Sequence, residues 1–257
     1  MVTKAFKIAL CIALSGITAF ASESGKIAAR AQKSIKAGNF AKGYSQLERA
    51  LVASRKEADL NAEMRIFIAM GQVRTMSLDF DMADTLLNHV PSNIDPLTKI
   101  MLVKAKMALK NSTSKYSEAV ALCESVDEDS LDDIADELQG AFYSECAIAY
   151  AGSKNKDKAQ KALKMVGKRT DDDTGIYYWT EGRITDLLNL GSANNAYLYA
   201  EREAVKTNSP YMTANSLYYR GKHLSKSNPA KSRELLDRCK TAFELMGLPN
   251  NAKRCAE

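Results

Sequence analysis

The chain has 257 residues, of which 46% are apolar, so it is long enough and apolar enough to bury a core. Its 36 basic and 31 acidic residues give a formal charge of +5, and no basic run exceeds two residues. Proteins that bind nucleic acid normally gather basic residues on one face, so this nearly even balance argues against nucleic acid as a partner.

The first 21 residues have the layout of a secretory signal peptide. Lys4 and Lys7 precede an apolar run from Ile8 to Phe20, and small residues at positions 19 and 21 predict cleavage between Ala21 and Ser22. The apolar run is shorter than the roughly 20 residues that a membrane-spanning helix needs, so we expect cleavage rather than anchoring. We therefore expect residues 22–257 to be exported, without an integral membrane segment, to a periplasm or cell surface.

The stretch from Gly38 to Leu51 has a pattern that returns five more times. Gly38 and Asn39 tolerate the left-handed backbone conformation that ends a helix. The residues after them place small and apolar side chains on one face of the next helix. The pattern starts at residues 40, 80, 116, 156, 193 and 229, which gives a period of 36 to 40 residues. A period in this range is typical of a solenoid of stacked helical hairpins.

A second amphipathic helix is predicted ahead of these starts. Its buried stripe is clearest at Tyr143, Cys146, Ala147 and Tyr150, before residue 156, and the second repeat has Phe67, Met70 and Gly71 in matching positions. The paired helices resemble the tetratricopeptide repeat (TPR) family, whose unit joins a first helix with a bulky, bulky, small, bulky stripe to a second with a small, aromatic, small stripe.

The TPR resemblance implies an all-α fold, a right-handed α-solenoid of about six antiparallel helix-turn-helix repeats. It would fill residues 22–257 as one elongated domain that ends in a short capping helix. In the family, the first helices line a concave groove that receives peptide segments of partner proteins. Carried over to this chain, that arrangement places the following residues toward a groove: Arg65, Ile68, Gln72, Ser144, Ile148, Tyr178, Tyr218 and Lys222.

The polar motifs of the chain predict no catalytic or metal site. The acidic run from Asp127 to Glu137 lacks the glycine and the ligand order of a calcium loop, and acidic residues are favoured at the start of a helix. Neither His89 nor His223 has a second ligand at zinc spacing. Phosphate loops, nucleophile elbows and HExxH pairs are absent from the sequence, so we expect neither an enzyme nor a cofactor.

Aromatic residues gather in the last third of the chain. Seven of the eleven tyrosines and the single tryptophan lie between Tyr177 and Tyr219. A helix buries one stripe, so the consecutive rings at 177 to 179 and at 218 to 219 cannot all face the same neighbour. The cluster is either a binding surface or the packing between the fifth and sixth repeats, and the sequence leaves both readings open.

Four cysteines follow the signal segment, and an exported protein usually meets oxidising conditions. Cys239 and Cys255 lie at similar distances on either side of the turn at Met246 to Pro249, so antiparallel helices would bring them level. They form either a disulfide that pins a short final helix or two buried thiols. Cys123 and Cys146 occupy stripe positions, where we expect buried thiols.

The resulting functional expectation is an exported scaffold for protein–protein interaction in envelope assembly, secretion or surface organisation. The partner would be a protein or peptide, and self-association stays open. Asn111-Ser112-Thr113 would be a glycosylation acceptor in a eukaryotic secretory protein, although we expect a bacterial source. The alternative function is a carbohydrate- or cell-wall-binding module that uses the aromatic cluster.

Overall fold

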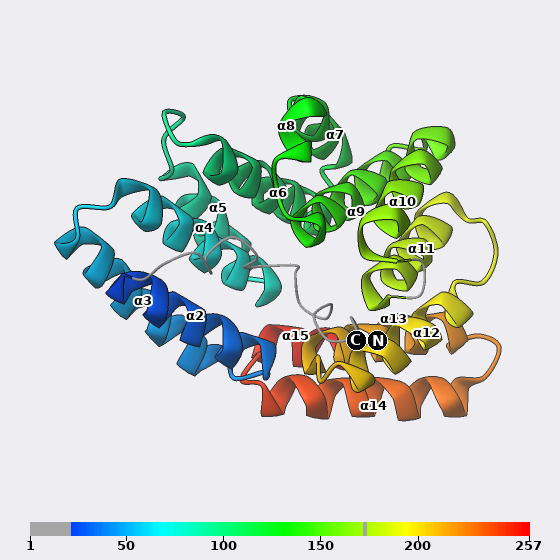
Figure 1. Cartoon of the computed structure of the whole chain (residues 1–257). Coiled ribbons are helices and arrows are strands. Elements are labelled where there is room, and N and C mark those ends of the chain that lie inside the picture. Colours follow the sequence, from blue (N-terminus) through cyan, green and yellow to red (C-terminus); the bar gives the residue numbers. More distant parts are fainter. Residues whose placement is uncertain (1–21, 172–173) are drawn as a thin grey trace, which may run out of the picture.

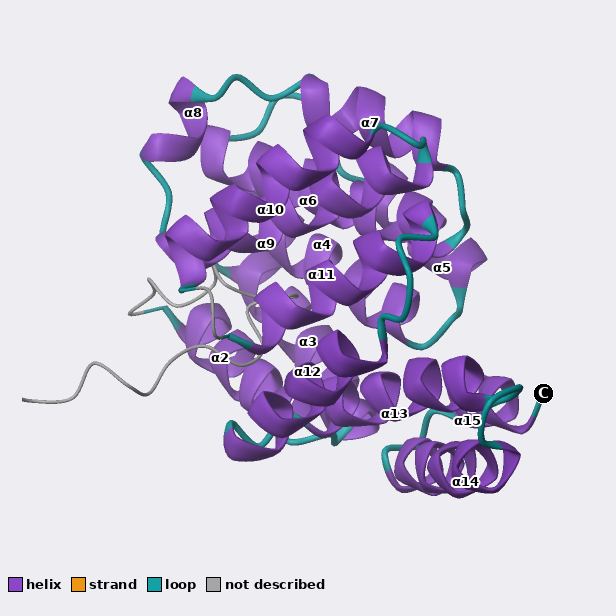
Figure 2. Cartoon of the chain, turned by 90° about the vertical axis from the view of Figure 1, so that its right-hand side faces the viewer, coloured by secondary structure: helices purple, strands orange, loops and turns teal. Residues whose placement is uncertain are grey.

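The computed structural model describes residues 22–171 and 174–257, and within them it contains helices but no strand, as Figure 2 shows. The expected signal segment, including Ala21, lies outside the described residues, and so do Asp172 and Asp173. Ser22 is the first described residue. The helices are α2 (Glu23–Lys36), α3 (Phe40–Lys56), α4 (Leu60–Met76), α5 (Phe80–Asn88), α6 (Pro96–Ser112), α7 (Tyr116–Glu124), α8 (Asp129–Asp132), α9 (Asp136–Gly152), α10 (Lys156–Thr170), α11 (Gly175–Leu188), α12 (Asn194–Lys206), α13 (Pro210–Leu224), α14 (Pro229–Leu245) and α15 (Pro249–Ala256). The predicted all-α class is confirmed for the described chain.

Each helix packs mainly against its neighbours in the sequence. The second helices of the pairs start at the residues where the repeated pattern starts: α3 at Phe40, α5 at Phe80, α7 at Tyr116, α10 at Lys156 and α14 at Pro229. In the fifth pair, Ala193 is the N-cap residue of α12. At α3, α10 and α14 the agreement has a local cause, because the side chains of Asn39, Asn155 and Asn228 accept a hydrogen bond from a backbone N–H in the first turn of the helix.

Small residues let neighbouring helices approach closely, both within a pair and between pairs. A Cβ atom added to Gly71 of α4 would lie 2.8 Å from the side chain of Leu87 of α5. A Cβ atom added to Gly152 of α9 would overlap the ring of Tyr116 of α7. Glycine is therefore required at both positions by the neighbouring helix and not by the backbone conformation.

The two ends of the chain meet, so the described chain is a closed ring rather than an elongated solenoid (Figure 1). Buried apolar residues of α2 to α6 form one continuous cluster with those of α13, α14 and α15. The rings of Phe40 and Tyr211 lie 5.6 Å apart, and the side-chain nitrogen of Asn251 donates to the carbonyl of Met76 at 3.1 Å. The expectation of an elongated domain is wrong in this respect, because the final helices pack back onto the first ones.

Two disulfides tie helices together. Cys239 and Cys255 join α14 to α15, with their Cα atoms 6.0 Å apart. Cys123 and Cys146 join α7 to α9, with their Cα atoms 5.5 Å apart, so the expectation of two buried thiols is wrong. The helical stripe pattern marked both residues as inward-facing, but it did not show that α7 packs against α9 with the two cysteines opposite each other.

Among residues 22–171 and 174–257, no helix combines the length and the apolar character required to cross a membrane.

Candidate binding pocket

The inner side of the ring holds a pocket of about 260 Å³. Five first helices of the pairs contribute to its wall, together with α7, α15 and the turns after α4 and α6. The pocket is lined by Thr75, Met76, Leu78, Ala108, Asn111, Ser112, Ser114, Tyr116, Glu145, Ile148, Trp179, Arg183, Tyr211, Met212, Asn215, Tyr219 and Arg254. Of the lining residues, Ser112 and Ser114 are exposed, at the end of α6 and in the turn that joins it to α7.

One wall of the pocket carries hydrogen-bond acceptors. The side-chain nitrogen of Asn111 donates to the carboxylate of Glu145 at 2.8 Å and to the main-chain carbonyl of Glu145 at 2.9 Å. The other side-chain atom of Asn111, Oδ1, has no hydrogen-bond partner within the described chain. Burial raises the pKa of the Glu145 carboxyl, although the Asn111 hydrogen bond and the charges of Lys104 and Arg183 partly oppose this.

Two guanidinium groups also line the pocket. Arg183 of α11 donates to the hydroxyl of Tyr219, and its guanidinium carbon lies 4.8 Å from the centre of the same ring. Arg254 of α15 donates to Oδ1 of Asn215 at 2.8 Å, and it lies 4.3 Å from the centre of the Tyr218 ring. The pocket therefore combines one carboxyl group with two cations whose positions are fixed by aromatic and amide neighbours.

The aromatic cluster divides between core and surface. Tyr197 is fully buried, and its hydroxyl donates to Asp186 at 2.6 Å. Trp179 lies 5.6 Å from Tyr197 and 5.3 Å from Tyr219, so these three rings pack the fifth pair against the sixth. Tyr199 is different, because 46% of its surface is exposed. Packing accounts for the centre of the cluster, and its outer edge remains open to contact.

The groove residues expected from the TPR resemblance do not form one surface. Ile68, Gln72, Ser144 and Ile148 are buried, and of the eight only Ile148 lines the central pocket. The hydroxyl of Ser144 shares a hydrogen bond of 2.6 Å with Thr180, which joins α9 to α11.

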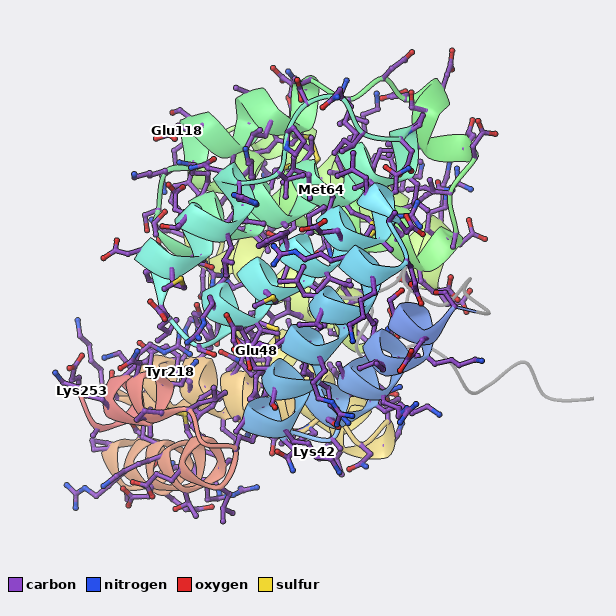
Figure 3. The ribbon with its side chains drawn as sticks, turned by 90° about the vertical axis from the view of Figure 1, so that its left-hand side faces the viewer. Lys42, Glu48, Met64, Glu118, Tyr218 and Lys253 are labelled. Carbon is purple, nitrogen blue, oxygen red and sulfur yellow. A yellow bond between two sulfur atoms is a disulfide. The ribbon has the colours of Figure 1, made fainter. Side chains whose placement is uncertain are left out.

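The other expected groove residues are scattered. Arg65 donates to Asp95 at 3.0 Å and to Thr98 at 2.7 Å, which joins α4 to α6. Tyr178 and Tyr218 are half-buried, and Lys222 is exposed. Figure 3 shows Tyr218 on α13 beside the helix that carries Lys253.

Sequence reasoning missed the polar residues of the pocket. Glu145 and Arg183 were not singled out, because their partners, Asn111 and Tyr219, lie in other helix pairs. Asn111 was noticed only as part of a glycosylation sequence. In the structure it is 6% exposed and bonded to Glu145, so its side chain is not accessible for glycosylation.

A second cavity, of about 490 Å³, lies on the outside of the ring beside the Cys123–Cys146 disulfide, and we call it the outer groove. It is lined by Cys123, Glu124, Val126, Glu128, Leu131, Phe142, Tyr143, Cys146, Tyr150, Lys158, Lys161, Ala162 and Met165, so its floor is mostly apolar. At its rim, Lys158 pairs with Glu124 at 2.7 Å. Burial, helped by Glu124, raises the pKa of Tyr150 to about 12.

No group of three or more potential metal ligands occurs in residues 22–171 and 174–257. His223 contacts Asp186, and the ring of His89 lies 4.5 Å from that of Phe67. No protein-family model and no curated protein matches the chain.

Proposed function

We propose that the chain is an exported, non-catalytic scaffold of the TPR type that binds a protein partner in cell-envelope assembly, secretion or surface organisation. In this proposal the helix pairs form a right-handed superhelix of six repeats, and the mature protein begins at Ser22 in a periplasm or at a cell surface. The partner binds on the outside of the ring, because the final helices close the ring and leave only a pocket of about 260 Å³ on the concave side, where peptides bind in the family.

The observation that carries the proposal is the outer groove. Its floor presents rings, methionine and aliphatic side chains, and its rim carries both carboxylates and ammonium groups. An apolar floor with a charged rim is the usual composition of a protein interface. The occupant that fits is a segment of a partner protein with apolar side chains between charges of both signs.

A crosslinked pull-down from the native envelope tests the proposal. The tagged full chain is compared with the Val126→Asp/Met165→Asp variant, which puts two charges into the half-buried lining of the outer groove. The matched control is Leu245→Asp, at an apolar residue of α14 that is 84% exposed. We expect one dominant protein that the groove variant loses and the control retains. Equal recovery by all three proteins, or recovery of none, contradicts the proposal.

Carbohydrate binding is the second candidate, and the outer edge of the aromatic cluster favours it. The rings of Tyr178 and Tyr199 lie 5.1 Å apart at an angle of 33°, and Arg202 lies 5.8 Å from the centre of the Tyr199 ring. An exposed ring beside a donor suits stacking against a sugar. Retention on purified cell-wall polysaccharide that is lost in Tyr199→Ala and kept in the outer-groove variant would support this function over protein binding.

A further inference from the structure

We propose that the central pocket binds a small zwitterion, a free amino acid or a dipeptide that carries both an ammonium and a carboxylate group. This inference is independent of the scaffold function, because the central pocket and the outer groove share no lining residue.

The charges of the lining require a ligand with both signs. The charged lining residues are Glu145, Arg183 and Arg254, which come from α9, α11 and α15. A simple anion would face the carboxyl of Glu145, and a simple cation would face two guanidinium groups. A neutral sugar would leave all three without a charged partner, at a cost in desolvation. A zwitterion can pair with each of them.

The ammonium position is defined by the acceptor wall. Oδ1 of Asn111 is unpaired, although the residue is only 6% exposed. Because Oδ1 itself is almost completely inaccessible, the acceptor that a ligand in the pocket can reach on this wall is the carboxyl of half-buried Glu145. The pocket also meets the last residues of α4 and α6, since Met76 and Ser112 line it. The partial negative charge of these helix ends favours a cation nearby.

The carboxylate position is defined by the two guanidinium groups. Arg183 is held by Tyr219, and Arg254 is held by Asn215 and Tyr218, so both are oriented before a ligand arrives. Guanidinium groups fixed in this way are suited to binding a carboxylate with two parallel hydrogen bonds.

The volume limits the size of the ligand. Pockets that hold drug-sized ligands measure about 300–1,000 Å³, and this pocket measures about 260 Å³. The rings of Trp179, Tyr116 and Tyr219 supply an apolar surface for a short side chain. A single amino acid or a dipeptide matches this size.

Titration calorimetry on the purified full chain tests the inference, with each standard L-amino acid and L-alanyl-L-alanine as probes. N-acetyl-L-alanine amide, which lacks both charges, and D-glucose serve as neutral controls. We expect at least one zwitterionic probe to bind and neither neutral compound to do so. Binding only by free amino acids, or only by the dipeptide, then identifies which of the two is the ligand. Absence of heat with every zwitterion, or equal binding of D-glucose, overturns the inference.

Variants link binding to the pocket. Glu145→Gln keeps an acceptor for Asn111 but removes the charge, and Arg254→Gln removes a guanidinium group near the end of the chain. Each should weaken binding by about tenfold or more. The matched control, Glu244→Gln on the outside of α14, should bind like the unmodified chain. Melting curves show that the variants are folded, and unchanged affinity in both folded pocket variants contradicts the inference. The outer-groove variant should bind the zwitterion normally, so failure here and failure of the scaffold proposal are distinguishable.

Discussion

The hydroxyl of Tyr211 donates a hydrogen bond to the main-chain carbonyl of Met76 at 3.0 Å, across 135 residues of sequence. It joins the start of α13 to the end of α4, and the ring of Tyr211 packs between Phe40 and Phe243. This side chain therefore links the first repeats to the last at the point where the ring closes.

Removing that hydroxyl should destabilise the ring measurably. Tyr211→Phe keeps the packing of the aromatic side chain and loses one hydrogen bond, which costs about 1 kcal/mol. Tyr211→Ala also leaves a cavity, so it should cost about 3–5 kcal/mol. Urea unfolding measures both values. Tyr199→Phe, at an exposed ring, is the control and should change little. Identical unfolding curves for Tyr211→Ala and the unmodified chain would show that the ends do not meet.

The C-terminal disulfide should hold α15 in place. The Cys239→Ala/Cys255→Ala variant opens a loop of sequence separation 16, for which the expected loss is about 3 kcal/mol. Hydrogen exchange should show that the amides of α15 lose protection. The Cys123→Ala/Cys146→Ala variant, with separation 23, should lose similar stability but keep α15 protected. Full protection of α15 without its disulfide would mean that packing alone fixes this helix.

The close approach of α7 and α9 depends on Gly152. In Gly152→Ala the new methyl group meets the ring of Tyr116, and overpacking of this kind costs about 1–3 kcal/mol. At Gly175 the nearest atom to an added Cβ is 3.5 Å away, which is ordinary contact, so Gly175→Ala is the matched control. Thermal unfolding compares the two variants. A Gly152→Ala protein as stable as the control would contradict the contact.

The raised pKa of Glu145 has a consequence for stability against pH. The folded state holds the Glu145 proton more tightly than the unfolded chain, whose glutamate pKa is about 4.3. As the pH rises above that value, this group therefore lowers the unfolding free energy until the folded carboxyl has ionised. Glu145→Gln removes the effect, so the variant should gain stability relative to the unmodified chain between acid and neutral pH. Chemical unfolding at several pH values measures this, and a constant difference would show that the pKa is not raised.

Local features of the sequence predicted the helices but not their closure. The starts of α3, α10 and α14 follow from the capping residues Asn39, Asn155 and Asn228, and the small and apolar residues of the repeated pattern mark the starts of α5 and α7. The contact between Tyr211 and Met76 depends on the angle between each helix pair and the next, added up around the ring. A local sequence pattern does not determine that total. The pocket could not be predicted for the same reason, because Glu145 and Arg254 line it together only when the ring of helices is closed.

Ring closure is the central claim, and small-angle X-ray scattering on residues 22–257 tests it most directly. A compact chain of this length has a radius of gyration of about 18 Å. The closed ring predicts a value near this one, with a single narrow distribution of interatomic distances. A clearly larger radius with an extended tail of long distances would show an open solenoid, and would contradict both the closure and the pocket that depends on it.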